Sequence, residues 1–307
     1  MANIMVVGSY VVDLMSRTPH MPKPGETVLG GPFQMGPGGK GSNQAVAAAR
    51  QGANVTMVTK VGHDLFGDHA MENFTEESID TTYVTRHTKE ATGTAIITVD
   101  DQGENTIVVA LGACGKITST DVQGAEQRLE ASDMVLVQLE TSMDAIRTTI
   151  QLARKHNKPV ILNPAPFQQI DDDLLQDIAY ITPNETEASL LTGIEVVDES
   201  SARKAAKQLI ERGVHAVVIT LGKQGCFVYD GSDEGTLVKG FPVQAVDTTG
   251  AGDAFNGGLA TFIAKGMKLD KAVIRANAVA AISVTKTGTA IAMPTMADVE
   301  EFLRNTK

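Results

Sequence analysis

The stretch Asp247-Thr248-Thr249-Gly250-Ala251-Gly252-Asp253 follows a short apolar segment, residues 241–246, and precedes a run with the composition of a helix, residues 254–263. Its glycines leave only backbone at the start of that helix, where free N–H groups and the helix dipole favour an anion. Asp253 adds a carboxylate at the same point. A base beside an anion hole is what phosphoryl transfer to a hydroxyl requires. A glycine-rich turn with a capping aspartate would have the same pattern, so this stretch alone leaves both interpretations open.

The composition narrows the class of protein. The chain has 307 residues, with 42% hydrophobic and 21% charged, which is typical of one large or two small globular domains. A net charge of -11 argues against nucleic acid and anionic membranes as partners, although helix N-termini and magnesium can still offset a nucleotide's phosphates. The two cysteines, Cys114 and Cys226, fit a reducing compartment and form no metal pattern. With no signal peptide and no apolar run of roughly 20 residues, we expect a cytoplasmic protein.

Most of the chain alternates between strand and helix patterns, which predicts a parallel sheet covered on both faces. The first apolar run, residues 4–7, ends shortly before Asp13. Polar residues also follow four later apolar runs, at the edge of the sheet where ligands of such folds bind. These runs and residues are 134–137 before Gln138 and Glu140, 159–162 before Asn163, 180–181 before Asn184 and Glu187, and 216–219 before Thr220 and Gly222.

Two segments interrupt this alternation. Prolines and glycines break residues 16–34, and the extended runs 94–99 and 104–109 are joined by a hairpin signal. We expect them to form a small β-sheet lid over the active site, with segments approximately 14–36 and 92–111 of a single domain that spans residues 1–307.

The glycine-rich segment 36–43 is ambiguous. It contains a G-x-G-x-x-G pattern at Gly36, Gly38 and Gly41, but it follows the proline-rich segment and not the first strand. A Walker loop is also excluded, because Lys40 precedes Gly41 and not Ser or Thr. The pattern instead favours close backbone approach to a small polar ligand, with Lys40 and Asn43 making directed contacts.

Three motifs in this order resemble a known family. The chain is similar to the ribokinases of the PfkB family of carbohydrate kinases over nearly its whole length. The matching motifs are Gly38-Gly39-Lys40-Gly41-Ser42-Asn43-Gln44, the N-x-x-E sequence Asn184-Glu185-Thr186-Glu187, and residues 247–253.

The resemblance implies a ribokinase-like α/β fold, a central mainly parallel sheet flanked by helices with a small β-sheet lid. It also implies a set of site residues. Asp253 would take the proton from the sugar's 5-hydroxyl, and Gly250, Ala251 and Gly252 would form the anion hole for the γ-phosphate. Sugar-binding positions match Asp13, Gly39, Lys40, Asn43, Glu140 and Asp253. Positions around ATP match Asn184, Glu187, Thr220, Gly222, Gly225, Gly252 and Asn277. Glu187 would act in handling Mg²⁺ and phosphate. A monovalent cation, usually K⁺, would bind at Asp247, Thr249, Ser283, Lys286, Gly288 and position 292.

Two positions depart from the family pattern. Val11 stands where an asparagine usually contacts the sugar, so one hydrogen-bonding group is missing. Ala292 stands where a serine is expected among the cation ligands, so a carbonyl or a water would have to replace it.

The sequence therefore predicts an ATP-dependent pentose kinase that makes ribose 5-phosphate. A 2-deoxyribose kinase remains open because of Val11. A sugar- or nucleoside-binding protein without catalysis is an alternative that the intact Asp253 argues against. An NAD-dependent dehydrogenase is disfavoured because nothing after the first strand matches the dinucleotide fingerprint. We also expect a homodimer joined lid to lid, since an uncovered sheet would otherwise expose its edge and face.

Overall fold

The computed structural model describes residues 1–232 and 234–306. Its main feature is a nine-stranded sheet in the order β13-β12-β11-β10-β9-β8-β1-β4-β5. The strands from β11 to β5 run parallel, whereas β12 and β13 are antiparallel additions at one edge. The strands are β1 (Asn3–Val7), β4 (Asn54–Gly62), β5 (Asp80–His87), β8 (Met134–Gln138), β9 (Val160–Asn163), β10 (Tyr180–Ile181), β11 (Ala216–Thr220), β12 (Gly225–Tyr229) and β13 (Thr236–Lys239).

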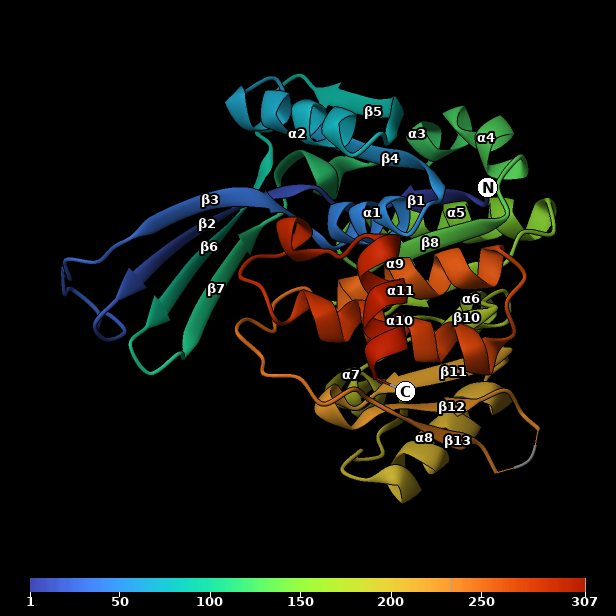
Figure 1. Ribbon diagram of the computed structural model, residues 1–307. Helices are drawn as coiled ribbons and strands as arrows, with labels where there is room; N and C mark the ends of the chain where they lie inside the picture. Colours follow the sequence, from blue (N-terminus) through green and yellow to red (C-terminus); the bar gives the residue numbers. More distant parts are fainter. Residues whose placement is uncertain (233, 307) are drawn as a thin grey trace.

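Helices cover both faces of this sheet (Figure 1). Two clusters of buried apolar side chains form the core, one on each face. The first cluster packs the sheet against α3 (Ser119–Gly124), α4 (Glu126–Glu130), α5 (Met143–Lys155), α6 (Asp172–Leu175), α7 (Glu185–Thr192) and α8 (Glu199–Glu211). The second packs it against α1 (Lys40–Arg50), α2 (Leu65–Glu76), α9 (Ala251–Ala264), α10 (Leu269–Ser283) and α11 (Met296–Asn305). The expected α/β fold with a mainly parallel sheet is confirmed.

Strands β1, β8 and β9 lie in the centre and carry nearly continuous buried runs. Such runs are what a strand covered on both faces requires. The polar side chains that follow these strands are therefore at the carboxyl edge of the sheet, as the sequence predicts.

A second sheet projects from this edge (Figure 1). It has the order β3-β2-β6-β7, built from β2 (Val11–Thr18), β3 (Phe33–Gly38), β6 (Gly93–Asp100) and β7 (Asn105–Ala110). The predicted hairpin is β6 and β7. The first strand of this sheet begins at Val11, so Asp13 is part of β2. Residues 26–29 form no strand.

Helices α1 and α9 approach each other closely behind the site. A Cβ on Gly257 of α9 would lie 2.4 Å from the carbonyl oxygen of Gln44 in α1, so only glycine allows this contact. The contact brings the start of α9 against the start of α1. The two glycine-rich motifs, far apart in sequence, thus meet at one end of the sheet.

Among the described residues, no helix combines the length and the apolar character needed to cross a membrane.

Candidate active site

The first turn of α9 carries Asp253. Gly250 caps this helix in the left-handed conformation, with φ 76°, which favours glycine. A Cβ at Gly252 would meet nothing within 4 Å, so a ligand can reach the backbone there. One of the three expected anion-hole donors is engaged, because the N–H of Ala251 donates to the carbonyl of Thr248 at 3.2 Å. The start of α9 therefore offers an anion site beside a carboxylate.

Asp253 is buried, with 6% of its surface exposed, and both of its oxygens accept hydrogen bonds. Asn43 Nδ2 donates to Oδ2 at 2.9 Å, and Gln44 Nε2 donates to Oδ1 at 2.9 Å. The Oδ1 atom of Asn43 is buried and has no hydrogen-bond partner within the described part of the chain. An orphaned acceptor is costly unless a ligand supplies a donor, as a sugar hydroxyl would.

Lys40 and Glu140 lie beside this carboxylate. The backbone N–H of Lys40 donates to Glu140 Oε2 at 2.8 Å, and the Ser9 hydroxyl donates to the same oxygen. Burial lowers the pKa of Lys40, but Asp253, Glu140 and Glu187 outweigh burial, so the net pKa of Lys40 is raised. The lysine therefore stays charged among the acidic groups.

Gly39, another expected sugar contact, connects β3 to α1. Its φ of 88° favours glycine, and a Cβ would lie 2.8 Å from the backbone nitrogen of Val11. This close approach holds β2 against the start of α1.

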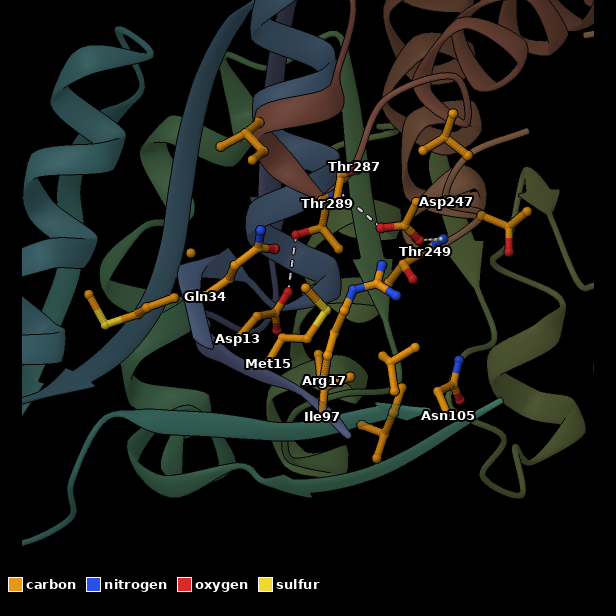
Figure 2. A pocket seen from close by; sticks show the side chains of 18 of the residues that line it. Asp13, Met15, Arg17, Gln34, Ile97, Asn105, Asp247, Thr249, Thr287 and Thr289 are labelled. Carbon is orange, nitrogen blue, oxygen red and sulfur yellow. Dashed lines mark hydrogen bonds between the residues drawn. The ribbon is translucent and has the colours of Figure 1, made fainter. Parts of the chain in front are cut away.

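A cavity of about 650 Å³ opens between the second sheet and two loops, residues 245–249 before α9 and residues 287–291 after α10. Asp13, Met15 and Arg17 line it from β2, and Asp247 and Thr249 line it from the loop before α9. Figure 2 shows Arg17 extending into this cavity towards that loop. Burial raises the pKa of Asp13 to about 6; the hydrogen bond from Thr289 opposes this, while nearby carboxylates add to it.

Val11 is not among the residues that line this cavity. It is 2% exposed and lies between Gly38 and Gly93 in the second sheet. A Cβ on Gly93 would lie 2.8 Å from Cγ1 of Val11, so the valine packs against backbone.

The N-x-x-E motif forms a capping box at the start of α7. Asn184 Oδ1 accepts from the Glu187 N–H at 2.8 Å, and Glu187 Oε2 accepts from the Asn184 N–H at 3.0 Å. The motif therefore has a local structural use. Burial first, and then Asp253, raise the pKa of Glu187, although its bond to Asn184 and the charge of Lys40 oppose this.

The remaining expected ATP positions lie along the edge near β11. A parallel bridge joins Asn184 to Thr220. Gly222 has a φ of 51° in the turn between β11 and β12, and Gly225, the first residue of β12, has a φ of 103°. Asn277 of α10 is buried, and its Nδ2 is 3.4 Å from the carbonyl oxygen of Lys239 at the end of β13.

The expected cation positions surround Asp247. Its Oδ1 accepts from the Thr249 N–H at 2.9 Å and its Oδ2 from the Gly288 N–H at 3.0 Å. The carbonyl of Ser283 accepts the N–H of Lys286 at 3.2 Å. Ala292 is buried in the 3₁₀ turn η3 (Ala290–Ala292) and supplies no side-chain oxygen. The described residues hold no cluster of three or more His, Cys, Asp or Glu suited to a metal, so a cation here would depend mainly on carbonyl oxygens.

Sequence reasoning missed several residues of this site. Thr289 contacts Asp13, and Ser9 contacts Glu140, but no pattern in the sequence links these pairs. Gln44 was inside a recognised motif, and its buried contact with Asp253 required the packing of α1 against α9. Arg17 was recognisable only as one charged residue in a proline-rich region.

Comparison with known proteins shows which family the chain belongs to. The profile of the pfkB family of carbohydrate kinases matches residues 1–296. The chain is 44% identical to a ribokinase from Haemophilus influenzae, over 98% of each chain. It is 37% identical to a deoxyribokinase from Salmonella typhi, again over 98% of each chain. The structure of Arabidopsis thaliana ribokinase complexed with ribose and ATP superposes with a TM-score of 0.92 at 29% identity, covering 99% of both chains. The chain therefore belongs to the pfkB family of carbohydrate kinases.

Proposed function

We propose that this kinase transfers the γ-phosphoryl group of ATP to the 5-hydroxyl of D-ribose and so makes ribose 5-phosphate. The observation that carries this proposal is the pairing of Asp253 with Asn43 at the start of α9. It joins a buried base, an open helix N-terminus and an unpaired acceptor in one place. The full-length similarity to ribokinases supports ribose as the acceptor.

Different residues act in catalysis, in sugar binding and in nucleotide binding. Asp253 takes the proton from the 5-hydroxyl as the hydroxyl oxygen attacks the γ-phosphorus and the bond from that phosphorus to ADP breaks. The N–H groups of Gly250, Ala251 and Gly252 stabilise the charge that moves with the phosphoryl group, and that of Ala251 is shared with the carbonyl of Thr248. Asp13, Gly39, Lys40, Asn43 and Glu140 hold the sugar. The nucleotide lies along Asn184, Thr220, Gly222, Gly225 and Asn277. The second sheet closes over the cavity as a lid and excludes water.

Two cations complete the proposed site. Mg²⁺ would neutralise the ATP phosphates near Glu187, whose half-buried carboxylate suits a hard cation. A monovalent cation, K⁺, would bind around Asp247, at the carbonyls of Thr249, Ser283, Lys286 and Gly288. Ala292 offers no ligand, so a carbonyl or a water takes its place. The backbone hydrogen bonds of Asp247 tie the loop before α9 to the Gly288 region, so a cation there would stiffen the loop that presents the N–H groups.

A second acceptor, 2-deoxy-D-ribose, is suggested by the valine at position 11, where the family pattern has an asparagine, although this valine packs against Gly93 and does not line the cavity. A valine cannot pair with a hydroxyl, and the chain is also similar to a deoxyribokinase. Binding without transfer fits less well, because a binding protein needs no buried base beside an anion site.

We also propose a homodimer formed through the lid. Alternate residues of a strand point to opposite faces of a sheet. Met15, Ile97 and Ile107 line the cavity, so the register directs Leu14, Ile96 and Val108 to the outer face. Ile96 and Val108 are 55% and 61% exposed, and Phe33 on the same face is 64% exposed. A second copy of the lid would cover this apolar surface.

A coupled assay of ADP release tests the function. ATP and Mg²⁺ are supplied with ribose, 2-deoxyribose, arabinose, fructose or adenosine in turn. We expect ribose or 2-deoxyribose to give the highest kcat/KM and a 5-phosphorylated product. ADP release that no sugar stimulates would contradict the proposal, as would a clear preference for adenosine.

A further inference from the structure

A fully buried amide, Gln44, connects Asp253 to the carboxyl edge of the main sheet. Gln44 Nε2 donates to Asp253 Oδ1 at 2.9 Å and to Asn163 Oδ1 at 3.0 Å. Gln44 Oε1 accepts from Gln138 Nε2 at 2.8 Å. Gln138 and Asn163 end the neighbouring strands β8 and β9 and face each other in the register. The Gln44 side chain thus links the ends of two central strands to Asp253.

The hydrogen bonds determine which way this amide faces. Both amide hydrogens of Gln44 are donated and its oxygen accepts. The reverse orientation would place its oxygen against the acceptor oxygens of Asp253 and Asn163, and its N–H₂ against a donor. Gln138 is itself confined, because a Cβ on Gly8 would lie 2.1 Å from its Oε1.

We propose that Gln44 is a positioning residue that holds Oδ1 of Asp253 inward, so that Oδ2 is the oxygen that takes the proton. This inference rests on the proposed kinase function. Oδ2 faces Asn43, whose unpaired Oδ1 marks the side where the acceptor hydroxyl binds. Oδ1 faces the buried amides, where no substrate can reach. Without Gln44 the carboxylate could rotate and exchange its two oxygens.

Holding the Asp253 carboxylate in one orientation should have a measurable effect on the rate. A base acts efficiently only when its oxygen is held in the productive position, and small misplacements cost about 10²-fold in rate. The titratable groups near Asp253 on other elements are Lys40 of α1, Glu187 of α7 and Asp13 of β2, together with Glu140 after β8, which acts on the same Lys40 and Asp13. All four remain in every variant below, so a change in the pH profile reports the contact with Gln44.

Two substitutions separate positioning from packing. Gln44→Met keeps a similar volume and removes the donated hydrogen bonds. Gln44→Glu places a second carboxyl group against Asp253, and two carboxylates at this distance cannot both ionise readily. Gln51→Met is the matched control. Gln51 is also fully buried and donates to a backbone carbonyl, that of Pro294 at 2.7 Å, but it is at the other end of α1.

The experiment measures kcat and KM for the preferred pentose, the pH dependence of kcat, and the melting temperature. We expect Gln44→Met to lower kcat by roughly 10–100-fold with KM within about threefold. For Gln44→Glu we expect the acid limb of the kcat profile to move to higher pH by about one unit, with activity partly restored at alkaline pH. Gln51→Met should leave kcat, KM and the pH profile of kcat unchanged, even where it lowers the melting temperature.

The outcomes distinguish this inference from the proposed function. If the wild-type protein shows no sugar-dependent ADP release, the function is wrong and the inference falls with it. If the wild type is active and Gln44→Met matches Gln51→Met in kcat and pH profile, only the inference is wrong. Should Gln44→Met fail to fold, Gln138→Met tests the hydrogen bond that Gln138 Nε2 donates to Gln44 Oε1. It leaves both donors to Asp253 in place, and we expect a loss of kcat of a few fold without a change in KM; an unchanged kcat would overturn the inference.

Discussion

Thr289 Oγ1 lies 3.1 Å from Oδ2 of Asp13 and 2.9 Å from the carbonyl oxygen of Pro37. The threonine hydroxyl has one hydrogen, so it cannot fully satisfy both oxygens while Asp13 is ionised. A protonated Asp13 removes this conflict, because it donates to Thr289, which then donates to Pro37. Burial, together with Glu140, Asp253 and Asp247, raises the pKa of Asp13 to about 6 and favours that arrangement.

The raised pKa predicts how Asp13 affects sugar binding. An ionised carboxylate accepts two sugar hydroxyls more strongly than a carboxylic acid does. We therefore expect the KM for ribose to rise as pH falls below about 6, the pKa of Asp13. Asp13→Asn should have a high KM that does not change over this range. Steady-state kinetics between pH 5 and pH 8 measure both, and a wild-type KM that is constant across pH 6 would contradict the prediction.

The raised pKa of Asp13 also predicts how the stability of the Asp13→Asn variant differs from that of the wild type as the pH changes. The pKa of Asp13 is about 6 in the folded protein against an ordinary value of 3.8, so the folded state disfavours the charged form. The protonated Asp13 therefore contributes stability to the folded protein that is fully present below pH 3.8 and is lost as the pH rises through about 6. Asp13→Asn should raise the free energy of unfolding by on the order of 1–3 kcal/mol above that range and by little below it. Urea unfolding at both ends of the range checks this.

The general fold could be predicted from sequence because its signals are local. Buried strands such as residues 134–138 are short apolar runs, and each is followed by polar residues at the edge of the sheet. The second sheet was harder, because β2 pairs with β6, which comes about eighty residues later in the chain. Nothing local indicates that pairing. The sequence therefore indicates Asp13 as a candidate site residue but not its place in β2.

The site shows the same division. The motifs indicate the roles of Asp253 and Asn43. They do not indicate the roles of Thr289 and Gln44, because these come from contacts between distant segments. The N-x-x-E motif illustrates a further difficulty. Its residues form a capping box, so the sequence pattern has a structural explanation that is independent of any contact with ATP.

Substitution of Asp253 tests the base directly. Asp253→Asn keeps the shape and removes the proton acceptor, so we expect kcat to fall by roughly 10²–10⁴-fold while ATP still binds. The amide also directs N–H groups towards Asn43 or Gln44, which are donors themselves, so a loss at the upper end is expected. Kinetics and calorimetric titration with ATP measure the two effects. Asp270→Asn, in the first turn of α10, is the control, and near-normal turnover by Asp253→Asn would exclude its role as base.

The proposed cation site predicts a dependence on potassium. We expect activity in K⁺ to be well above activity in Na⁺ or in Tris alone after thorough desalting. Because Ala292 lacks the expected ligand, Ala292→Ser should tighten the apparent affinity for K⁺ by a few fold. Ala290→Ser, a buried alanine in the same 3₁₀ turn, is the matched control. A rate that is independent of the cation in the wild type and in Ala292→Ser would exclude the site.

The proposed dimer predicts the effect of charge on the outer face of the lid. Ile96→Lys and Val108→Lys place cations where the second copy would pack, and burying unpaired charge is unfavourable. We expect light scattering at micromolar concentration to show a dimer for the wild type and a monomer for these variants. Val197→Lys should remain a dimer, because Val197 is 68% exposed but lies before α8, outside the lid. A monomeric wild type would contradict the proposal.

Val11 tests which pentose the site prefers. Ribose and 2-deoxyribose differ by one hydroxyl, and a hydroxyl buried without a partner costs about 1–3 kcal/mol. If the 2-hydroxyl is bound near Val11, that cost applies to ribose and not to 2-deoxyribose. Val11→Asn should then shift the ratio of kcat/KM towards ribose by about tenfold, which corresponds to about 1.4 kcal/mol.

The packing around Val11 determines the control. The side chain is 2% exposed and lies against Gly93, so an asparagine there also loses apolar contacts. Val11→Ala removes bulk without adding a polar group, so it should lower stability while leaving the preference between the two sugars close to that of the wild type. Strong selectivity for ribose in the wild type, unchanged in Val11→Asn, would show that Glu140, Asn43 or a water binds the 2-hydroxyl. Position 11 would then contribute to the packing of the lid and not to the choice of sugar.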